Sequence, residues 1–237
     1  MIFKILKKFA LLAFNIVDIY YHQVRIKIFL KKKKIPLNTF FDVGSHLGSY
    51  TDIIMKLNPQ SNCFLFEPQI RIFEKVKNKY IQLNNIKVYN LGISDTENIK
   101  NLFINMHDLT STFSSFNEKS KYLNFKAKLY ETSIDKMNYK TEQVNTITLN
   151  KFILTNKIKS IDLIKIDTEG HDLKVLYGLE KEIDIVKNIL IEFHHRDLFL
   201  DYKPYEIHDF LIKNGFELIK IFKFPFSWQD RFYSKKN

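Results

Sequence analysis

A glycine turn between an apolar run and a helix-like segment constrains this chain more than any other feature. The segment Phe40–Thr51 predicts a short strand, a tight turn and the start of a helix. The chain has only six glycines, and Gly44 and Gly48 stand four residues apart in this turn. Glycine is useful where a chain turns tightly or must approach a ligand. A strand that leads through such a turn into a helix N-terminus is how α/β folds build a nucleotide cradle.

The spacing within this turn separates two classes of cofactor. Asp42, Gly44 and Gly48 form the pattern D-x-G-x-x-x-G, whereas dinucleotide sites carry G-x-G-x-x-G. The difference argues against a dinucleotide and favours S-adenosylmethionine, whose adenosine carries no pyrophosphate. A nicotinamide-dependent oxidoreductase on a similar sheet is the alternative class of enzyme.

Composition indicates the cellular compartment and restricts the class of partners. Hydrophobic residues make up 45% of the 237 residues, which is enough for a full core. The single cysteine, Cys63, excludes a disulfide framework and favours a reducing compartment, the cytoplasm. The net charge of +11 comes almost entirely from dispersed lysines. Nucleic-acid binders cluster basic residues on one face, so we expect no nucleic-acid partner.

Residues 1–34 form one unit and residues 35–237 a second. Apolar residues recur at helical spacing over Ile2–Tyr20, and Lys31–Lys34 is a basic run. The uncharged run Phe9–Val17 is too short to span a bilayer, and no cleavage site of small residues follows it. We favour a helix packed on the second unit or on another subunit of a homo-oligomer. The alternatives are peripheral contact with the cytoplasmic face of a membrane, or a non-catalytic membrane-binding module.

From residue 38 onward, strand-like and helix-like segments alternate. This alternation predicts an α/β fold with a doubly wound, mostly parallel sheet and helices on both faces. Residues 96–145 are rich in Ser, Thr and Asn and are expected to be less regular. The expected strands are Phe40–Val43, Cys63–Phe66, Ile86–Leu91, Ile161–Ile166, Ile189–Phe193 and Phe216–Phe222, which closes the sheet.

Carboxylates follow the predicted strands at or just past their carboxyl ends. Ligands of open α/β sheets bind in the crevice at those ends. Glu67 lies 25 residues after Asp42 and can accept hydrogen bonds from the hydroxyls of an adenine-linked ribose. The full set of these acids is Asp42, Glu67, Asp95, Asp167 and Glu192.

Together these segments resemble the FkbM family of S-adenosylmethionine-dependent methyltransferases. The most distinctive part is a lysine-containing strand followed by D-x-E-G, within Ile161–Asp172. Val144–Asn150 is also similar, although an aspartate is usual where Asn150 stands. The other matching segments, in the family's order before this strand, are Phe41–Thr51, Phe66–Pro68 and Gly92–Asp95.

The resemblance implies a seven-stranded, Rossmann-like methyltransferase sheet and methyl transfer to a hydroxyl of a sugar, glycan or natural product. It implies that Glu67 holds the ribose and that Ser94 and Asp95 contact the adenine. The acceptor pocket is expected within residues 96–145, which carry no motif. The full set of expected S-adenosylmethionine-binding residues is Asp42, Gly44, Ser45, His46, Gly48, Tyr50, Thr51, Glu67, Pro68, Ser94, Asp95 and Asp167.

A hydroxyl needs a base to take its proton before it can attack a methyl group. His171 is the first candidate, because imidazole suits this work near neutral pH. Glu169, Glu192 and His194 are the alternatives at the same sheet edge. We expect no metal, although Asp167, Glu169 and His171 offer a minority interpretation as a divalent-cation set.

Overall fold

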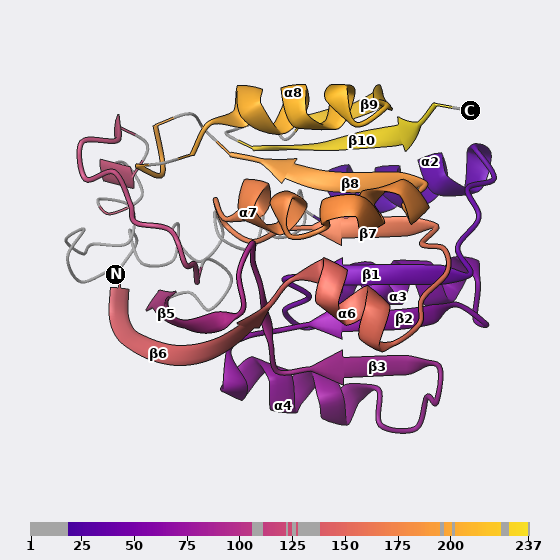
Figure 1. Ribbon diagram of the computed structural model, residues 1–237, viewed down its shortest axis with the longest axis horizontal. Coiled ribbons are helices and arrows are strands. Elements are labelled where there is room, and N and C mark those ends of the chain that lie inside the picture. Colours follow the sequence, from indigo (N-terminus) through magenta and orange to yellow (C-terminus); the bar gives the residue numbers. More distant parts are fainter. Residues whose placement is uncertain are drawn as a thin grey trace, which may run out of the picture.

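A seven-stranded sheet with the strand order β3-β2-β1-β7-β8-β10-β9 forms the centre of the protein (Figure 1). The computed structural model describes residues 19–105, 111–121, 123–124, 127, 138–194, 197–200, 202–223 and 228–236. Only β10 runs against the other strands, so the expected mostly parallel sheet is confirmed. The strands are β1 (Thr39–Val43), β2 (Asn62–Phe66), β3 (Ile86–Tyr89), β7 (Leu163–Ile166), β8 (Asn188–Phe193), β9 (Phe216–Lys223) and β10 (Gln229–Lys235).

Helices cover both faces of this sheet, as expected, because alternate strand residues point to opposite sides. Phe40 packs into a buried cluster with α2 and α3, whereas Phe41 packs into a cluster with α6, α7 and α8. The carboxyl ends of the parallel strands therefore share one rim between two helical layers. The helices are η1 (Ile19–Val24), α2 (Arg25–Lys32), α3 (Ser49–Leu57), α4 (Ile70–Lys79), α6 (Leu149–Thr155), α7 (Asp172–Tyr177), η4 (Glu180–Ile185) and α8 (Pro204–Lys213).

Phe216–Phe222, within β9, forms the edge of the sheet as expected, but an unexpected strand, β10, lies between β8 and β9. Its sequence has few apolar residues, so it carries no strand signal. The charged residues of β10 contact other side chains of the protein. Asp230 is buried against other polar groups, and the Arg231 guanidinium stacks 3.8 Å from the centre of the Phe193 ring.

A second, three-stranded sheet corrects the expectation that residues 96–145 are less regular. It consists of β4 (Gly92–Ile93), β5 (Asn98–Asn105) and β6 (Asn138–Ile147) in the order β4-β6-β5. The apolar side chains that it buries are few, so its Asn- and Thr-rich strands resemble loops in sequence. Figure 1 shows this sheet beside the edge where the parallel strands of the main sheet end.

The described part of the N-terminal segment packs on the main sheet. Ile26 and Leu30 of α2 are buried in the same cluster as Phe40 of β1. This packing agrees with the favoured interpretation for residues 22–32, whereas the stripe before residue 19 lies outside the described residues. Among the helices that the structure describes, none is long and apolar enough to cross a membrane.

Candidate active site

The predicted glycine turn connects β1 to α3 through three residues with a left-handed backbone. The φ angles are 76° at Gly44, 44° at His46 and 74° at Gly48, which is the N-cap of α3. The amides of Gly44 and Ser45 both donate to the carbonyl of Phe66 at 3.1 Å, which ties the turn to β2. The turn therefore lies at the carboxyl ends of β1 and β2.

The protein itself requires glycine at two positions of this turn. A Cβ at Gly44 would overlap the carbonyl oxygen of Asp167, just past β7. A Cβ at Gly48 would overlap the Tyr80 hydroxyl, which donates to the Gly48 carbonyl at 2.8 Å. From the sequence, these glycines were expected to let the backbone approach the cofactor. In the structure they also allow close packing against neighbouring strands and helices.

Asp42 and Glu67 hold the turn from two sides. Asp42 accepts a hydrogen bond from the Thr51 hydroxyl at 2.7 Å, which joins β1 to the first turn of α3. Burial raises the pKa of Asp42 to about 6. Glu67 accepts bonds from the backbone amides of His46 and Gln69, each at 2.9 Å. The two oxygens of a carboxylate offer about four acceptor positions in all.

His171, the first candidate for the base, contacts Ser94, one of the two residues expected to contact the adenine. The Ser94 hydroxyl lies 2.9 Å from Nε2 of His171 and 3.0 Å from Oδ1 of Asp95. Lys100 also donates to Ser94 at 2.8 Å. Burial, together with the charge of Lys100, lowers the pKa of His171 to about 4. His171 is thus a buried, neutral imidazole bonded to Ser94.

The other three candidates for the base meet around His194. Its Nε2 lies 3.6 Å from Oε2 of Glu192, and its Nδ1 lies 3.9 Å from Oε2 of Glu169. One ligand-type atom each from Asp167, Glu192 and His194 lies within 4.8 Å of the other two. Burial, reinforced by the neighbouring Asp167, raises the pKa of Glu192 well above its usual value. The cation set of the minority interpretation changes accordingly, since Glu192 and His194 join Asp167 where Glu169 and His171 were expected.

A buried ion pair lies beside this cluster and was missed by the sequence analysis. Lys165 is 1% exposed, and its Nζ lies 3.2 Å from Oδ1 of Asp230 and 3.3 Å from Oδ2 of Asp167. Asp230 also accepts from the Tyr50 hydroxyl at 2.6 Å and contacts Nδ1 of His22 at 3.1 Å. Lys165 was visible as a charge within an apolar strand, whereas Asp230 lies on the unexpected strand β10.

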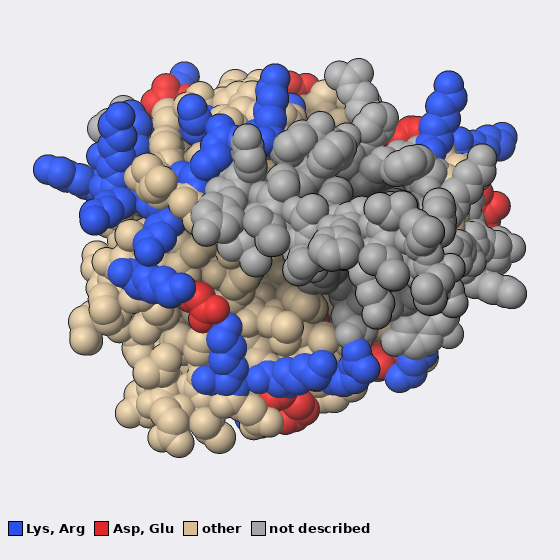
Figure 2. Space-filling view, turned by 180° about the vertical axis from the view of Figure 1, so that it is seen from behind, with Lys and Arg blue, Asp and Glu red and all other residues tan. Residues whose placement is uncertain are grey.

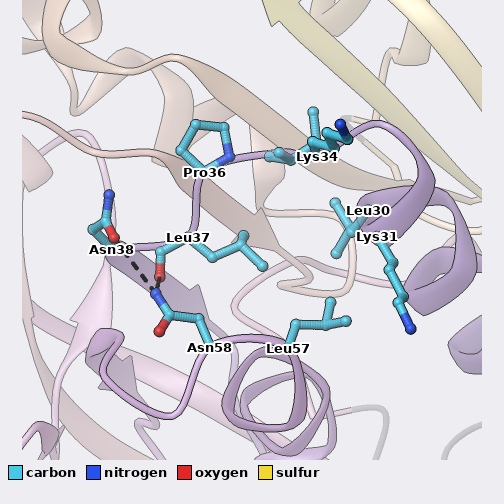
Figure 3. A pocket seen from close by; sticks show the side chains of 9 residues that line it. Leu30, Lys31, Lys34, Pro36, Leu37, Asn38, Leu57 and Asn58 are labelled. Atoms are coloured by element: carbon cyan, nitrogen blue, oxygen red, sulfur yellow. Dashed lines mark hydrogen bonds between the residues drawn. The ribbon is translucent and has the colours of Figure 1, made fainter.

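A pocket at the opposite edge of the sheet is not part of this site. It has a volume of about 330 Å³ and lies between the end of α2, the start of β1 and the end of α3 (Figure 3). Leu30, Leu37 and Leu57 form its apolar part, and Lys31 and Lys34 line its rim. The amino ends of parallel strands are not where ligands of such sheets bind.

Comparison with known proteins agrees with this geometry. The sequence pattern of the methyltransferase FkbM domain matches residues 42–218. A protein named Methyltransferase 1, from Beauveria bassiana, is 25% identical over 158 residues, which are 64% of this chain. The match covers 62% of that relative, so the chain spans less than two thirds of its length.

Solved structures share the fold. Magnesium protoporphyrin IX methyltransferase from Synechocystis PCC 6803, solved with bound SAM, has a TM-score of 0.50 and 8% identity. The alignment covers 90% of this chain and 77% of that one. A putative rRNA methylase from Clostridium thermocellum has a TM-score of 0.50 and 10% identity, covering 91% and 96% of the two chains. At these identities the likeness concerns the fold alone.

Proposed function

Since the chain belongs to the FkbM family of methyltransferases and its cofactor is S-adenosylmethionine, we propose that it methylates a hydroxyl oxygen of a sugar, glycan or natural product. The observation that carries the proposal is the position of the acid–base cluster directly beside the glycine turn. The amide of Asp167 donates to the carbonyl of Val43 at 3.0 Å, and Gly44 packs against the Asp167 carbonyl. A proton acceptor therefore lies next to the cofactor turn.

The residues around the turn fit the cofactor. The hydroxyl of Ser45 is buried and has no hydrogen-bond partner among the described residues, so it is available to a ligand. Glu67 is positioned at the end of β2 to accept from ribose hydroxyls. We assign Ser94 and Asp95, which follow β4, to the adenine. When bound, S-adenosylmethionine supplies a methyl group already activated by a sulfonium.

Proton removal is assigned to the cluster rather than to His171. The Nε2 atom of His171 is already bonded to Ser94, and its imidazole is held neutral by burial. The ring of His194 instead lies between Glu169 and Glu192, and its buried Nε2 makes no hydrogen bond among the described residues. An acceptor hydroxyl beside these groups can lose its proton as the oxygen aligns with the methyl carbon.

The test is the position of a labelled methyl group in the product. The purified chain is incubated with isotopically labelled S-adenosylmethionine and with fractionated sugars, glycans and natural products, and each labelled product is examined by NMR. We expect a methyl group bound to oxygen, and we expect Glu192→Gln and His194→Ala to reduce turnover by about 10²-fold. A methyl group on nitrogen or carbon would contradict the proposal.

A further inference from the structure

We propose that Asp167, Glu192 and His194 form a divalent-cation site at the carboxyl ends of β7 and β8. For its catalytic role this inference rests on the proposed function, because the cation would bind the acceptor hydroxyl. For metal binding itself it rests only on the geometry of the three side chains. Each side chain follows or ends a strand of the rigid central sheet.

The spacing of the three side chains suits one cation. Their ligand-type atoms lie within 4.8 Å of one another, and Nε2 of His194 is 3.6 Å from Oε2 of Glu192. Neighbouring ligands of an octahedral ion with bonds of about 2.1 Å stand about 3 Å apart. Binding of one ion would require side-chain rotations that close this difference. The Asp167 side chain is 32% exposed, which leaves an opening for a ligand from solvent.

His194 provides an independent indication of a missing partner. Its side chain is 5% exposed, and Nε2 has no hydrogen bond among the described residues. Buried polar atoms nearly always have a partner. The ring is packed against Phe199 and Tyr202, with ring centres 5.4 and 5.6 Å away, so Nε2 is held toward Glu192. Glu169 lies beside the other ring nitrogen, as carboxylates do behind metal-bound histidines.

The acidic side chains of the region can attract a cation even though the ammonium of Lys165 lies close by. The ammonium of Lys165 lies 3.3 Å from Asp167, but it also contacts Asp230 at 3.2 Å, which can balance it. Asp167, Glu169 and Glu192 place three acidic side chains around one imidazole. Carboxylate and imidazole ligands together are compatible with Mn²⁺, which is the divalent ion used as the probe below.

The cation would prepare the acceptor for methyl transfer. A hydroxyl bound to a divalent ion loses its proton at a lower pH than a free hydroxyl. In this step the O–H bond breaks and the proton passes to the Glu169 carboxylate. The oxygen then forms a bond to the methyl carbon of S-adenosylmethionine, and the electron pair of the broken carbon–sulfur bond stays on sulfur.

The experiment is a titration of the full chain with Mn²⁺, followed by the loss of the EPR signal of the free ion. We expect one saturable site in the wild-type protein. Glu192→Gln and His194→Asn should each weaken it by at least about tenfold. The matched controls are Glu206→Gln and His208→Asn on α8, whose partners are Lys203 and Tyr233 and which should leave binding unchanged.

A second measurement keeps the test independent of the variants' folding. Bound Mn²⁺ should raise the unfolding temperature of the wild-type chain, because the ligand binds only the folded state. The absence of saturable Mn²⁺ binding, or equal binding by the cluster variants, would overturn the site. If Mn²⁺ binds at the cluster but the labelled methyl appears on nitrogen or carbon, the proposed function fails and the site stands. If O-methylation proceeds unchanged with chelator and without Mn²⁺ binding, the site fails and the function stands.

Discussion

At the scale of single residues, Glu67 connects the fold to the proposed cofactor site. Its carboxylate accepts hydrogen bonds from the amides of His46 and Gln69. Glu67→Gln keeps one acceptor oxygen and therefore disturbs these bonds less than truncation of the side chain would. We expect Glu67→Gln to weaken S-adenosylhomocysteine binding by roughly 1.5–3 kcal/mol, or about 10- to 150-fold. Calorimetric titration measures this change, with Glu74→Gln on the exposed face of α4 as control. Unchanged affinity would remove Glu67 from the cofactor site.

Substitutions at two glycines with positive φ allow the cost of backbone strain to be measured apart from the cost of close packing. Gly44 and Gly215 have φ angles of 76° and 81°, but a Cβ would overlap the Asp167 carbonyl only at Gly44. At Gly215 the nearest atom lies 3.8 Å away. Gly215→Ala should therefore cost about 1–2 kcal/mol for the left-handed backbone, and Gly44→Ala clearly more. Urea unfolding measures both values, and equal costs would show that the Asp167 contact can relax.

His171 makes stability depend on acidity. In the unfolded chain the imidazole gains a proton as the pH falls below about 6.5, whereas the folded chain keeps it neutral down to about 4. The folded state is then increasingly disfavoured between these values, with a loss on the order of 2–3 kcal/mol near pH 4.5. His171→Gln should flatten this part of the profile of unfolding free energy against pH. An equally steep profile in the variant would assign the acid sensitivity to other groups.

At the scale of secondary-structure elements, β10 is the last strand in the element order and reaches the site through Asp230. Asp230→Asn removes the carboxylate that balances Lys165 and accepts from Tyr50, and should cost about 3–5 kcal/mol of unfolding free energy. Asp184→Asn is the matched control, because Asp184 pairs with Lys235 while its side chain is 79% exposed. An exposed pair contributes at most about 1 kcal/mol. Similar costs for the two variants, measured by urea unfolding, would contradict the burial argument.

The elements that could be predicted from sequence are those with an apolar signal. β1, β2, β7 and β8 are buried on both faces and appear as continuous apolar runs, which explains why their positions were predicted correctly. β5, β6 and β10 bury few apolar side chains and depend on partners distant in sequence. No local pattern contains that information, so these strands and the role of Asp230 were missed.

At the scale of the whole molecule, the N-terminal segment connects distant parts of the fold. His22 contacts Asp230, which lies 208 residues later, and α2 covers one face of the sheet through Ile26 and Leu30. Helical spacing predicts such an apolar stripe but does not say which surface it covers. The remaining face of α2 is different, since Ile28 is 58% exposed and Lys31–Lys34 are exposed. Figure 2 shows Lys and Arg side chains gathered toward the edge where Figure 1 places α2.

The two faces of α2 allow its core role to be tested apart from a membrane role. Ile26→Ala with Leu30→Ala should lower the unfolding free energy by about 4 kcal/mol or more, because each deletion leaves a cavity in the core. Val24→Ala with Ile28→Ala alters two exposed positions, the N-cap of α2 and its outer face, and should change stability by less than about 1 kcal/mol. Chemical denaturation of the full chain measures both.

Sedimentation with anionic liposomes addresses the membrane hypothesis with the same proteins. If α2 served only as a membrane anchor, the Ile26 and Leu30 pair would be as tolerant as the exposed pair, and deletion of residues 1–34 would leave the remainder as stable as before. We expect instead that the deletion destabilises the protein, because it removes Ile26, Leu30 and the His22 partner of Asp230.

Peripheral binding through the lysines would appear as salt-sensitive sedimentation of the full chain, since charges are screened over about 8–10 Å at physiological ionic strength. A deletion variant of unchanged stability that no longer sediments would show that the segment acts as an anchor and not as part of the core.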